Sequence, residues 1–144
     1  MKNIWKIMAA LLIVALPFIT AACGDDDKED DGPKTYTYSW LLQNTSLPAT
    51  ATTAEKSEAL IAETTINGLF ATAFRAQGFT VDANKQEFTI LTQDAISQFD
   101  NKVKSAVYAV KSSDALAAAA EKLPASAKIQ VKRGGTAIIT ESLR

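Results

Sequence analysis

The chain has 144 residues, of which 15 are lysine or arginine and 16 are aspartate or glutamate, with no histidine and one cysteine. This length allows one domain of ordinary size, and the composition excludes histidine-based nucleophilic catalysis, histidine-ligated metals, internal disulfides and multi-thiolate clusters. The net charge of -1 gives no support for nucleic-acid binding, which needs a basic surface to neutralise phosphates. We therefore expect no nucleic-acid partner, no cofactor and no metal site.

Residues 1–22 have the features of a cleavable secretory signal. Two lysines among the first residues precede an apolar run over residues 7–19, and Ala21 and Ala22 follow it. A helix needs about 20 apolar residues to cross the hydrocarbon core of a bilayer. Because the run is shorter than that, a signal peptide is favoured over a transmembrane anchor or a buried core helix.

The residues before the single cysteine point to a lipid anchor. At this point the chain reads Ile19-Thr20-Ala21-Ala22-Cys23. This stretch resembles the lipobox of bacterial lipoproteins, which implies that the signal is cut before Cys23 and that this cysteine is diacylated on sulfur and acylated on its new amino terminus. Since several acyl chains bind a membrane durably, we expect Cys23 to anchor the protein to a membrane. The alternative is an ordinary cleavage site followed by a free thiol.

Residues 23–34 are expected to form an acidic, disordered tether. Between Gly24 and Pro33 the chain carries six carboxylates and one lysine, so it repels itself and has no apolar surface to bury. The segment resembles the acidic export signal that places Bacteroidetes-type lipoproteins on the outer face of the outer membrane. The resemblance implies an outer-membrane protein displayed at the cell surface, with a periplasm-facing orientation as the alternative. It covers residues 1–32 and implies nothing about the domain that follows.

Residues 35–144 are expected to form one folded domain that begins with a strand and a long helix. Side-chain alternation predicts the strand over residues 35–42. Thr52 and Glu55 have the spacing of a capping box, and apolar residues recur behind them at helical spacing. This pattern predicts a helix over residues 53–76.

The rest of the domain alternates hairpins with helices. Turn residues within the segment 79–91 predict a hairpin, and Asp94 is expected to cap a helix whose apolar stripe runs from Ile96 to Val110. A short alanine-rich helix ends before Pro124, and a glycine pair in the segment 128–140 predicts a second hairpin. Together these elements predict an α+β two-layer sandwich, in which a mostly antiparallel sheet of about five strands is covered on one face by two to three helices.

Three aromatic residues on the first strand are candidate ligand-binding residues. Tyr36, Tyr38 and Trp40 are spaced two apart, so their rings form a continuous platform on one face of the strand. Exposed rings of this kind stack against the apolar faces of sugars. The alternative, which we favour, is that the rings pack beneath the helices as core.

The polar alternates on the strands define a candidate protein-contact face. If the apolar strand residues face the helices, these alternates form a broad, open surface on the other side of an antiparallel sheet. The face comprises Thr35, Thr37, Ser39, Thr89, Lys128, Gln130 and Lys132. The alternative is a solvated face without a partner.

These features favour a non-catalytic surface lipoprotein that binds or supports another component of the cell envelope. One alternative is a glycan-binding module that uses the strand aromatics. A second alternative is a carboxylate-dependent hydrolase, because an enzyme without histidine must depend on carboxylates, lysine or tyrosine. No residue is assigned a catalytic role.

Overall fold

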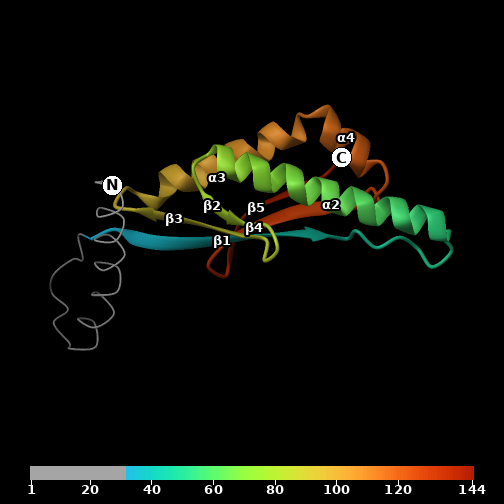
Figure 1. Ribbon diagram of the computed structural model, residues 1–144, viewed down its shortest axis with the longest axis horizontal. Coiled ribbons are helices and arrows are strands. Elements are labelled where there is room, and N and C mark those ends of the chain that lie inside the picture. Colours follow the sequence, from blue (N-terminus) through green and yellow to red (C-terminus); the bar gives the residue numbers. More distant parts are fainter. Residues whose placement is uncertain (1–31) are drawn as a thin grey trace, which may run out of the picture.

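The computed structural model describes residues 32–144, so the expected signal segment, Cys23 and most of the tether lie outside the described residues. The elements are, in chain order, β1 (Lys34–Gln43), α2 (Thr53–Ala76), β2 (Thr80–Asp82), β3 (Glu87–Thr92), α3 (Ile96–Lys111), α4 (Asp114–Ala120), β4 (Lys128–Arg133) and β5 (Thr136–Ser142). Figure 1 shows the helices on one side of the strands. Strand β1 begins at Lys34, one residue inside the expected tether.

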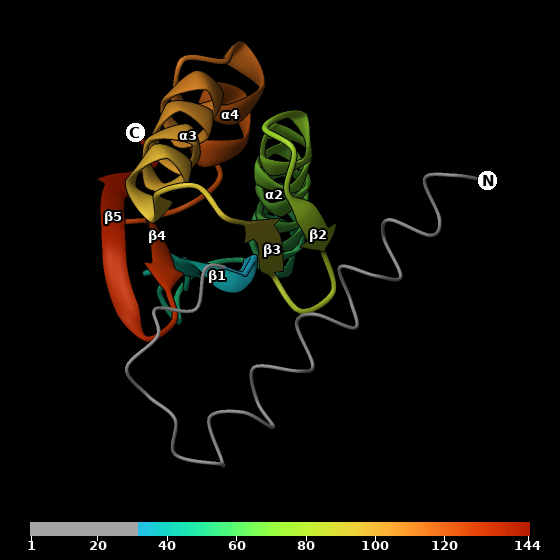
Figure 2. The ribbon, with the colours of Figure 1, turned by 90° about the vertical axis from the view of Figure 1, so that its left-hand side faces the viewer.

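The five strands form one sheet in the order β2-β3-β1-β4-β5, and every neighbouring pair is antiparallel. Strand β1 is central because its first part pairs with β3 and its last part pairs with β4. Figure 2 shows the sheet curving around α2, α3 and α4, which all lie on its inner side. The predicted two-layer α+β arrangement is therefore confirmed, with three helices in the described part of the chain.

Helix α2 begins and ends where the sequence predicts. The Thr52 hydroxyl accepts a hydrogen bond from the Glu55 backbone N–H at 3.2 Å, and the Glu55 carboxylate accepts one from the Thr52 backbone N–H at 2.7 Å. This reciprocal capping box satisfies two N–H groups that the start of a helix leaves unpaired. Beyond the last turn Gly78 has a φ of 92°, a conformation that glycine adopts without a steric penalty and that ends the helix.

The predicted cap of helix α3 is wrong by one residue. Ala95, not Asp94, occupies the N-cap position, and it offers no side-chain acceptor. The physical reason is that the Thr92 hydroxyl accepts a hydrogen bond from the Asp94 backbone N–H at 2.9 Å, which ties these residues into a turn before the helix starts. Helix α4 has a side-chain cap, because the Ser113 hydroxyl accepts from the Leu116 N–H at 3.2 Å.

Both predicted hairpins are present. Between β2 and β3, Asp82 Oδ1 accepts hydrogen bonds from the backbone N–H groups of Asn84 and Lys85 at 3.1 and 3.2 Å. Between β4 and β5, Gly134 has a φ of 61°, which supplies the left-handed conformation that a tight turn needs. The pairing of β4 with β5 also contains a register shift after Val131, so the strand edge bends there.

The core lies between the inner face of the sheet and the three helices. Its largest fully buried side chains include Tyr38, Ile66, Phe70, Phe74, Phe88, Leu116 and Ile129. Within the described residues, the strands and the core side chains lie between Lys34 and Leu143, and the three helices cover the inner face of the sheet. We therefore expect residues 32–144 to fold without the segment that precedes them.

Candidate functional site

The candidate ligand-binding aromatics lie on the inner face of the sheet. Tyr38 is 0% exposed and Trp40 is 2% exposed, while Tyr36 is partly buried against the same core. Their direction follows from strand alternation, which places Tyr38 opposite Phe88 and Trp40 opposite Val131. The exposed aromatic platform therefore does not form, because these rings are needed to fill the space under the helices.

Phe88 lies at the centre of an aromatic cluster that joins the sheet to α2. Its ring stacks on Phe74 with a centroid distance of 4.1 Å and on Tyr38 at 4.9 Å, and Phe79 meets it edge-on at 4.9 Å. Trp40 packs at a tilt against Phe74 at 5.5 Å. Aromatic pairs of this kind contribute about 0.5–1.5 kcal/mol each beyond the area they bury. The aromatic residues of β1 therefore stabilise the fold rather than offer a ligand platform.

Tyr38, Asp100 and Arg133 form a polar triad that ties helix α3 to the sheet. The Tyr38 hydroxyl donates to Asp100 Oδ1 at 2.8 Å, and the Arg133 guanidinium pairs with Asp100 Oδ2. Burial, and then the hydrogen bond to Asp100, raise the pKa of Tyr38 above its ordinary value of 10.0. Because both carboxylate oxygens are engaged and the hydroxyl stays protonated, this triad fixes the position of α3 rather than transferring protons.

A second polar contact fixes Trp40. Its indole Nε1–H donates to Asn67 Oδ1 at 3.0 Å, and the Gln86 side-chain amide donates to the same oxygen at 2.7 Å. Since Asn67 lies on α2, this oxygen links the helix to β1 and to the turn before β3. Asn67 is not among the residues predicted from the sequence, although a polar residue next to the apolar positions of a helix is a signal for such a contact.

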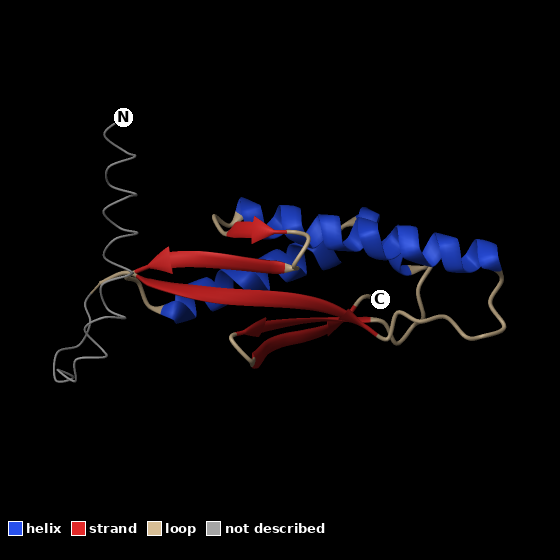
Figure 3. Ribbon diagram, turned by 60° about the horizontal axis from the view of Figure 1, so that its bottom comes forward, coloured by secondary structure: helices blue, strands red, loops and turns tan. Residues whose placement is uncertain are grey.

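The seven residues of the candidate protein-contact face all lie on the outer face of the sheet. The register sets Thr37 opposite Thr89 and Ser39 opposite Lys132, on the side away from the buried residues of the same strands. Figure 3 shows these strands in front of the helices, and no described segment covers them. We define the outer face as Thr35, Thr37, Ser39, Leu41, Glu87, Thr89, Leu91, Lys128, Gln130 and Lys132.

Two leucines on the outer face were not expected. Leu41 is 51% exposed and Leu91 is 42% exposed. Leu91 lies opposite Thr35 near the start of β1, and Leu41 lies near the end of the same strand. At about 3.3 Å of rise per residue, the two leucines are roughly 20 Å apart along the sheet. The outer face therefore carries one exposed apolar side chain toward each end of β1.

Charge changes sign across the outer face. One row of the register runs from Glu87 on β3 through Ser39 on β1 to Lys132 on β4. Lys128 adds a second positive charge on β4, opposite Gln43. The face is therefore negative toward β3 and positive toward β4, with hydroxyl and amide groups between the charges.

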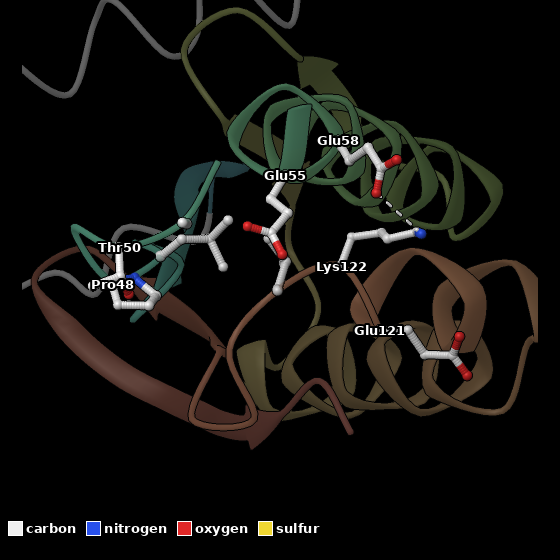
Figure 4. A pocket seen from close by; sticks show the side chains of 9 residues that line it. Pro48, Thr50, Glu55, Glu58, Glu121 and Lys122 are labelled. Atoms are coloured by element: carbon white, nitrogen blue, oxygen red, sulfur yellow. Dashed lines mark ion pairs between the residues drawn. The ribbon is translucent and has the colours of Figure 1, made fainter. Parts of the chain in front are cut away.

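A hollow of about 490 Å³ lies where β1 has ended and α2 begins. It is lined by Leu47, Pro48, Thr50, Ala51, Glu55, Glu58, Glu121, Lys122 and Leu123. Figure 4 shows Glu58 turned toward Lys122, with which it forms an ion pair at 3.1 Å, and Glu121 turned away from it. The hydrogen bond from the Thr52 backbone N–H lowers the pKa of Glu55, so this carboxylate stays ionised and is a poor general acid. Glu55 is therefore engaged as a helix cap, and Glu58 as the partner of Lys122.

Other features of the described residues bear on function. Within residues 32–144 no group of three or more acidic, cysteine or histidine side chains is placed to hold a metal ion. No helix in the same range is long and apolar enough to cross a membrane. The predicted lipidation at Cys23 falls outside the described residues and stays a prediction.

Comparisons with family models, with curated proteins and with solved structures found no match.

Proposed function

We propose that the protein is a lipid-anchored, non-catalytic component of the outer membrane that binds another envelope protein through the outer face of its sheet. The observation that carries the proposal is the outer face itself. The three neighbouring strands β3, β1 and β4 present it without a covering segment in the described part of the chain, and it combines polar side chains with the exposed Leu41 and Leu91. Contact surfaces between soluble proteins commonly combine polar and apolar groups in this way.

The charge pattern favours a protein as the partner. An anionic membrane surface attracts uniformly basic patches, whereas this face carries Glu87 on one side of Ser39 and Lys132 on the other. A folded partner with the reverse pattern would meet both charges in one orientation, which gives specificity as well as attraction. No specific observation favours a glycan, because Tyr38 and Trp40 lie in the core.

The length of the tether supports a partner in the same envelope layer. Ten residues separate Cys23 from Lys34, and a fully extended chain of that length spans about 35 Å at most. That reach is similar to the length of β1, whose 10 residues extend over about 33 Å. A lipidated Cys23 would therefore hold the domain within about one domain length of the membrane surface.

Site-specific photo-crosslinking on intact cells tests the proposed face. A photo-reactive residue at Thr37 or at Gln130 should give an adduct with one and the same protein, since both positions lie on the outer face. Lys132→Glu should reduce both adducts because it removes a positive charge from that face. A photo-reactive residue at Ser105, exposed on α3, is the matched control and should not give this adduct. Identical products from all three positions, or none from Thr37 and Gln130, would contradict the proposal.

The lipid anchor has an independent test. Cys23→Ser should abolish incorporation of labelled fatty acid and release the protein from membranes, because the cysteine sulfur is the expected acyl acceptor. Protease added to intact cells should remove the domain if it is displayed outside. Full lipid incorporation in Cys23→Ser would overturn the anchor, and protection from protease would assign the domain to the periplasmic side.

A further inference from the structure

Helix α2 presents an exposed face that lacks charge over most of its length. Ser57, Ile61, Thr65, Gly68 and Thr72 are exposed and recur at three- and four-residue spacing, so they lie in one row, which we call the α2 face. Ile61 is 67% exposed, and the neighbouring Leu60 is 65% exposed. They are the two most exposed large apolar side chains in the described part of the chain. A helix face turned to solvent ordinarily carries charged residues, so this face resembles a contact surface.

The α2 face combines a protruding side chain with an empty position. A Cβ placed on Gly68 would meet no atom of any other described part of the chain within 4 Å, so no described segment covers this glycine. Between Gly68 and Ile61, the Thr65 hydroxyl donates to the Ile61 carbonyl oxygen at 2.9 Å, and the Thr64 hydroxyl donates to the Leu60 carbonyl oxygen at 3.0 Å. These hydroxyls are satisfied within the helix, so covering them leaves no donor unpaired.

We infer that the α2 face binds the same face of a second copy of the chain, with the two α2 helices antiparallel. Setting Ile61 against Gly68 of the second copy places the twofold axis between Thr64 and Thr65. The same contact is then made twice, as in any isologous interface. Each large side chain enters the space that a glycine leaves, which lets the helix axes approach closely.

The charges at the ends of the α2 face favour the antiparallel arrangement. In this register Arg75 lies opposite residue 54 of the second copy, beside the acidic residues Glu55 and Glu58 in the first turns of that helix. Arg75 forms no ion pair within the described residues, and Glu58 is shared with the half-exposed Lys122. Opposite charges therefore meet at both ends of the pair. A parallel pair would instead set Ile61 against Ile61 and Arg75 against Arg75.

The size of the α2 face limits the strength of the pair. From residue 54 to Arg75 the helix rises about 32 Å, and a contact about 10 Å wide buries roughly 600 Å² over both copies. Stable interfaces bury about 1,200 Å² or more, so the pair is weak in dilute solution. Copies that share a membrane meet at a much higher effective concentration. Pairing at native abundance therefore depends on the proposed lipid anchor. The geometry of the pair does not depend on it.

Disulfide trapping tests the geometry without the anchor. Residues 32–144 contain no cysteine, so Ile61→Cys and Gly68→Cys each introduce a single thiol. The two variants are mixed in equal amounts at about 1 mM and oxidised. Random collision would make half of all disulfide-linked dimers mixed ones, and the antiparallel register predicts that the mixed dimer exceeds this half. Ser105→Cys, on the exposed side of α3, is the control and should give the random share with either variant. A random share for the mixture of Ile61→Cys with Gly68→Cys, or an excess of the like-with-like disulfides, overturns the inference.

A second pair of variants separates loss of contact from loss of fold. Gly68→Gln places a long side chain in the space that Ile61 of the second copy would occupy, so it should weaken self-association about tenfold or more by sedimentation equilibrium. Because glutamine is a better helix former than glycine, the same variant should raise the thermal midpoint of the domain. Gly68→Ala should also raise the thermal midpoint but have a smaller effect on self-association, because a methyl group takes up less of the space above residue 68. Unchanged association in Gly68→Gln contradicts the inference. If pairing is seen in solution but full-length protein in vesicles does not pair more strongly, the proposed anchor fails while the α2 contact stands.

Discussion

Removing the Asp100 carboxylate should destabilise the domain more than removing the hydroxyl that donates to it. Asp100 lies on α3, and its two oxygens engage Tyr38 of β1 and Arg133 of β4. The comparison uses Asp100→Ala, Tyr38→Phe and the double variant. The comparison measures how much free energy of unfolding the Asp100 side chain contributes by holding α3 to β1 and β4.

The magnitudes follow from burial. Asp100→Ala leaves the Tyr38 hydroxyl buried without an acceptor, which costs about 1–3 kcal/mol. The lost ion pair adds at most about 1 kcal/mol, because the side chains of Arg133 and Asp100 are 32% and 19% exposed and are screened by water. The free energy of unfolding should therefore fall by about 2–4 kcal/mol. Tyr38→Phe keeps the ring stacked on Phe88 and keeps the ion pair between Arg133 and Asp100. It should therefore lower the free energy of unfolding by only about 1 kcal/mol.

Urea unfolding of residues 32–144 measures these free energies, with Trp40 as the only tryptophan in that segment. The double variant should cost less than the sum of the single variants by about 1 kcal/mol, because a missing hydroxyl cannot be left unpaired. Asp94→Ala is the control and should change stability by less than about 0.5 kcal/mol, since Asp94 is exposed and does not cap α3. Equal costs for Asp100→Ala and Tyr38→Phe, or strict additivity, would refute this reasoning.

Three further predictions concern the capping box and two titrating groups. Thr52→Ala should lower the free energy of unfolding by about 1 kcal/mol in urea titrations, because it removes the hydroxyl that caps α2; no change would mean that water replaces the cap. Because the pKa of Tyr38 is raised in the folded state, its contribution is fully present below the ordinary tyrosine pKa of 10.0 and is lost as the pH rises above it. The alkaline loss of stability should therefore be smaller in Tyr38→Phe, and identical alkaline curves would argue against burial of this hydroxyl. Lys111 on α3 forms an ion pair with Glu141 on β5 at 2.7 Å, and this contact lowers the pKa of the Glu141 carboxyl below 4.5. The contribution of the pair to stability is therefore present above that pH and disappears as the pH falls through the lowered pKa. Glu141→Gln should accordingly be less stable than the parent at pH 7 and match it near pH 2, and a difference that persists in acid would contradict the ion pair.

The elements were predictable because their signals are local. The capping box at Thr52 and Glu55, Gly78 just after α2 and the apolar period of α3 each depend on residues a few positions apart. The one error in this class, the cap at Asp94, has a local cause as well. The Thr92 hydroxyl accepts a hydrogen bond from the Asp94 N–H and holds Asp94 in a turn before the helix begins.

The contacts between elements were not predictable in the same way. The sequence places Asp100 four residues before Lys104, which suggests a surface ion pair along α3, yet its carboxylate pairs with Arg133 across the sheet. Asn67 acquires its role only because the fold brings Trp40 and Gln86 to the same oxygen. Such partners depend on tertiary distance, which a single sequence does not contain.

The outer face illustrates both cases. Its polar members follow from strand alternation, and the register places all of them on one side. Leu41 is not in the predicted face, because an apolar residue at the end of a strand is ordinarily assigned to the core. Strand alternation puts Leu41 on the same side as Thr35, Thr37 and Ser39, and with Trp40 buried on the inner side Leu41 is 51% exposed.

Accessibility of the outer face on living cells tests the central proposal most directly. Thr37→Cys and Ser105→Cys would be expressed in the full chain and treated with a membrane-impermeant maleimide, on intact cells and as purified protein. The account predicts that Ser105→Cys is labelled in both cases, whereas Thr37→Cys is labelled when purified and protected on cells by its partner. Equal labelling of Thr37→Cys in both settings would contradict an occupied outer face, and absence of labelling at both positions on cells would contradict surface display.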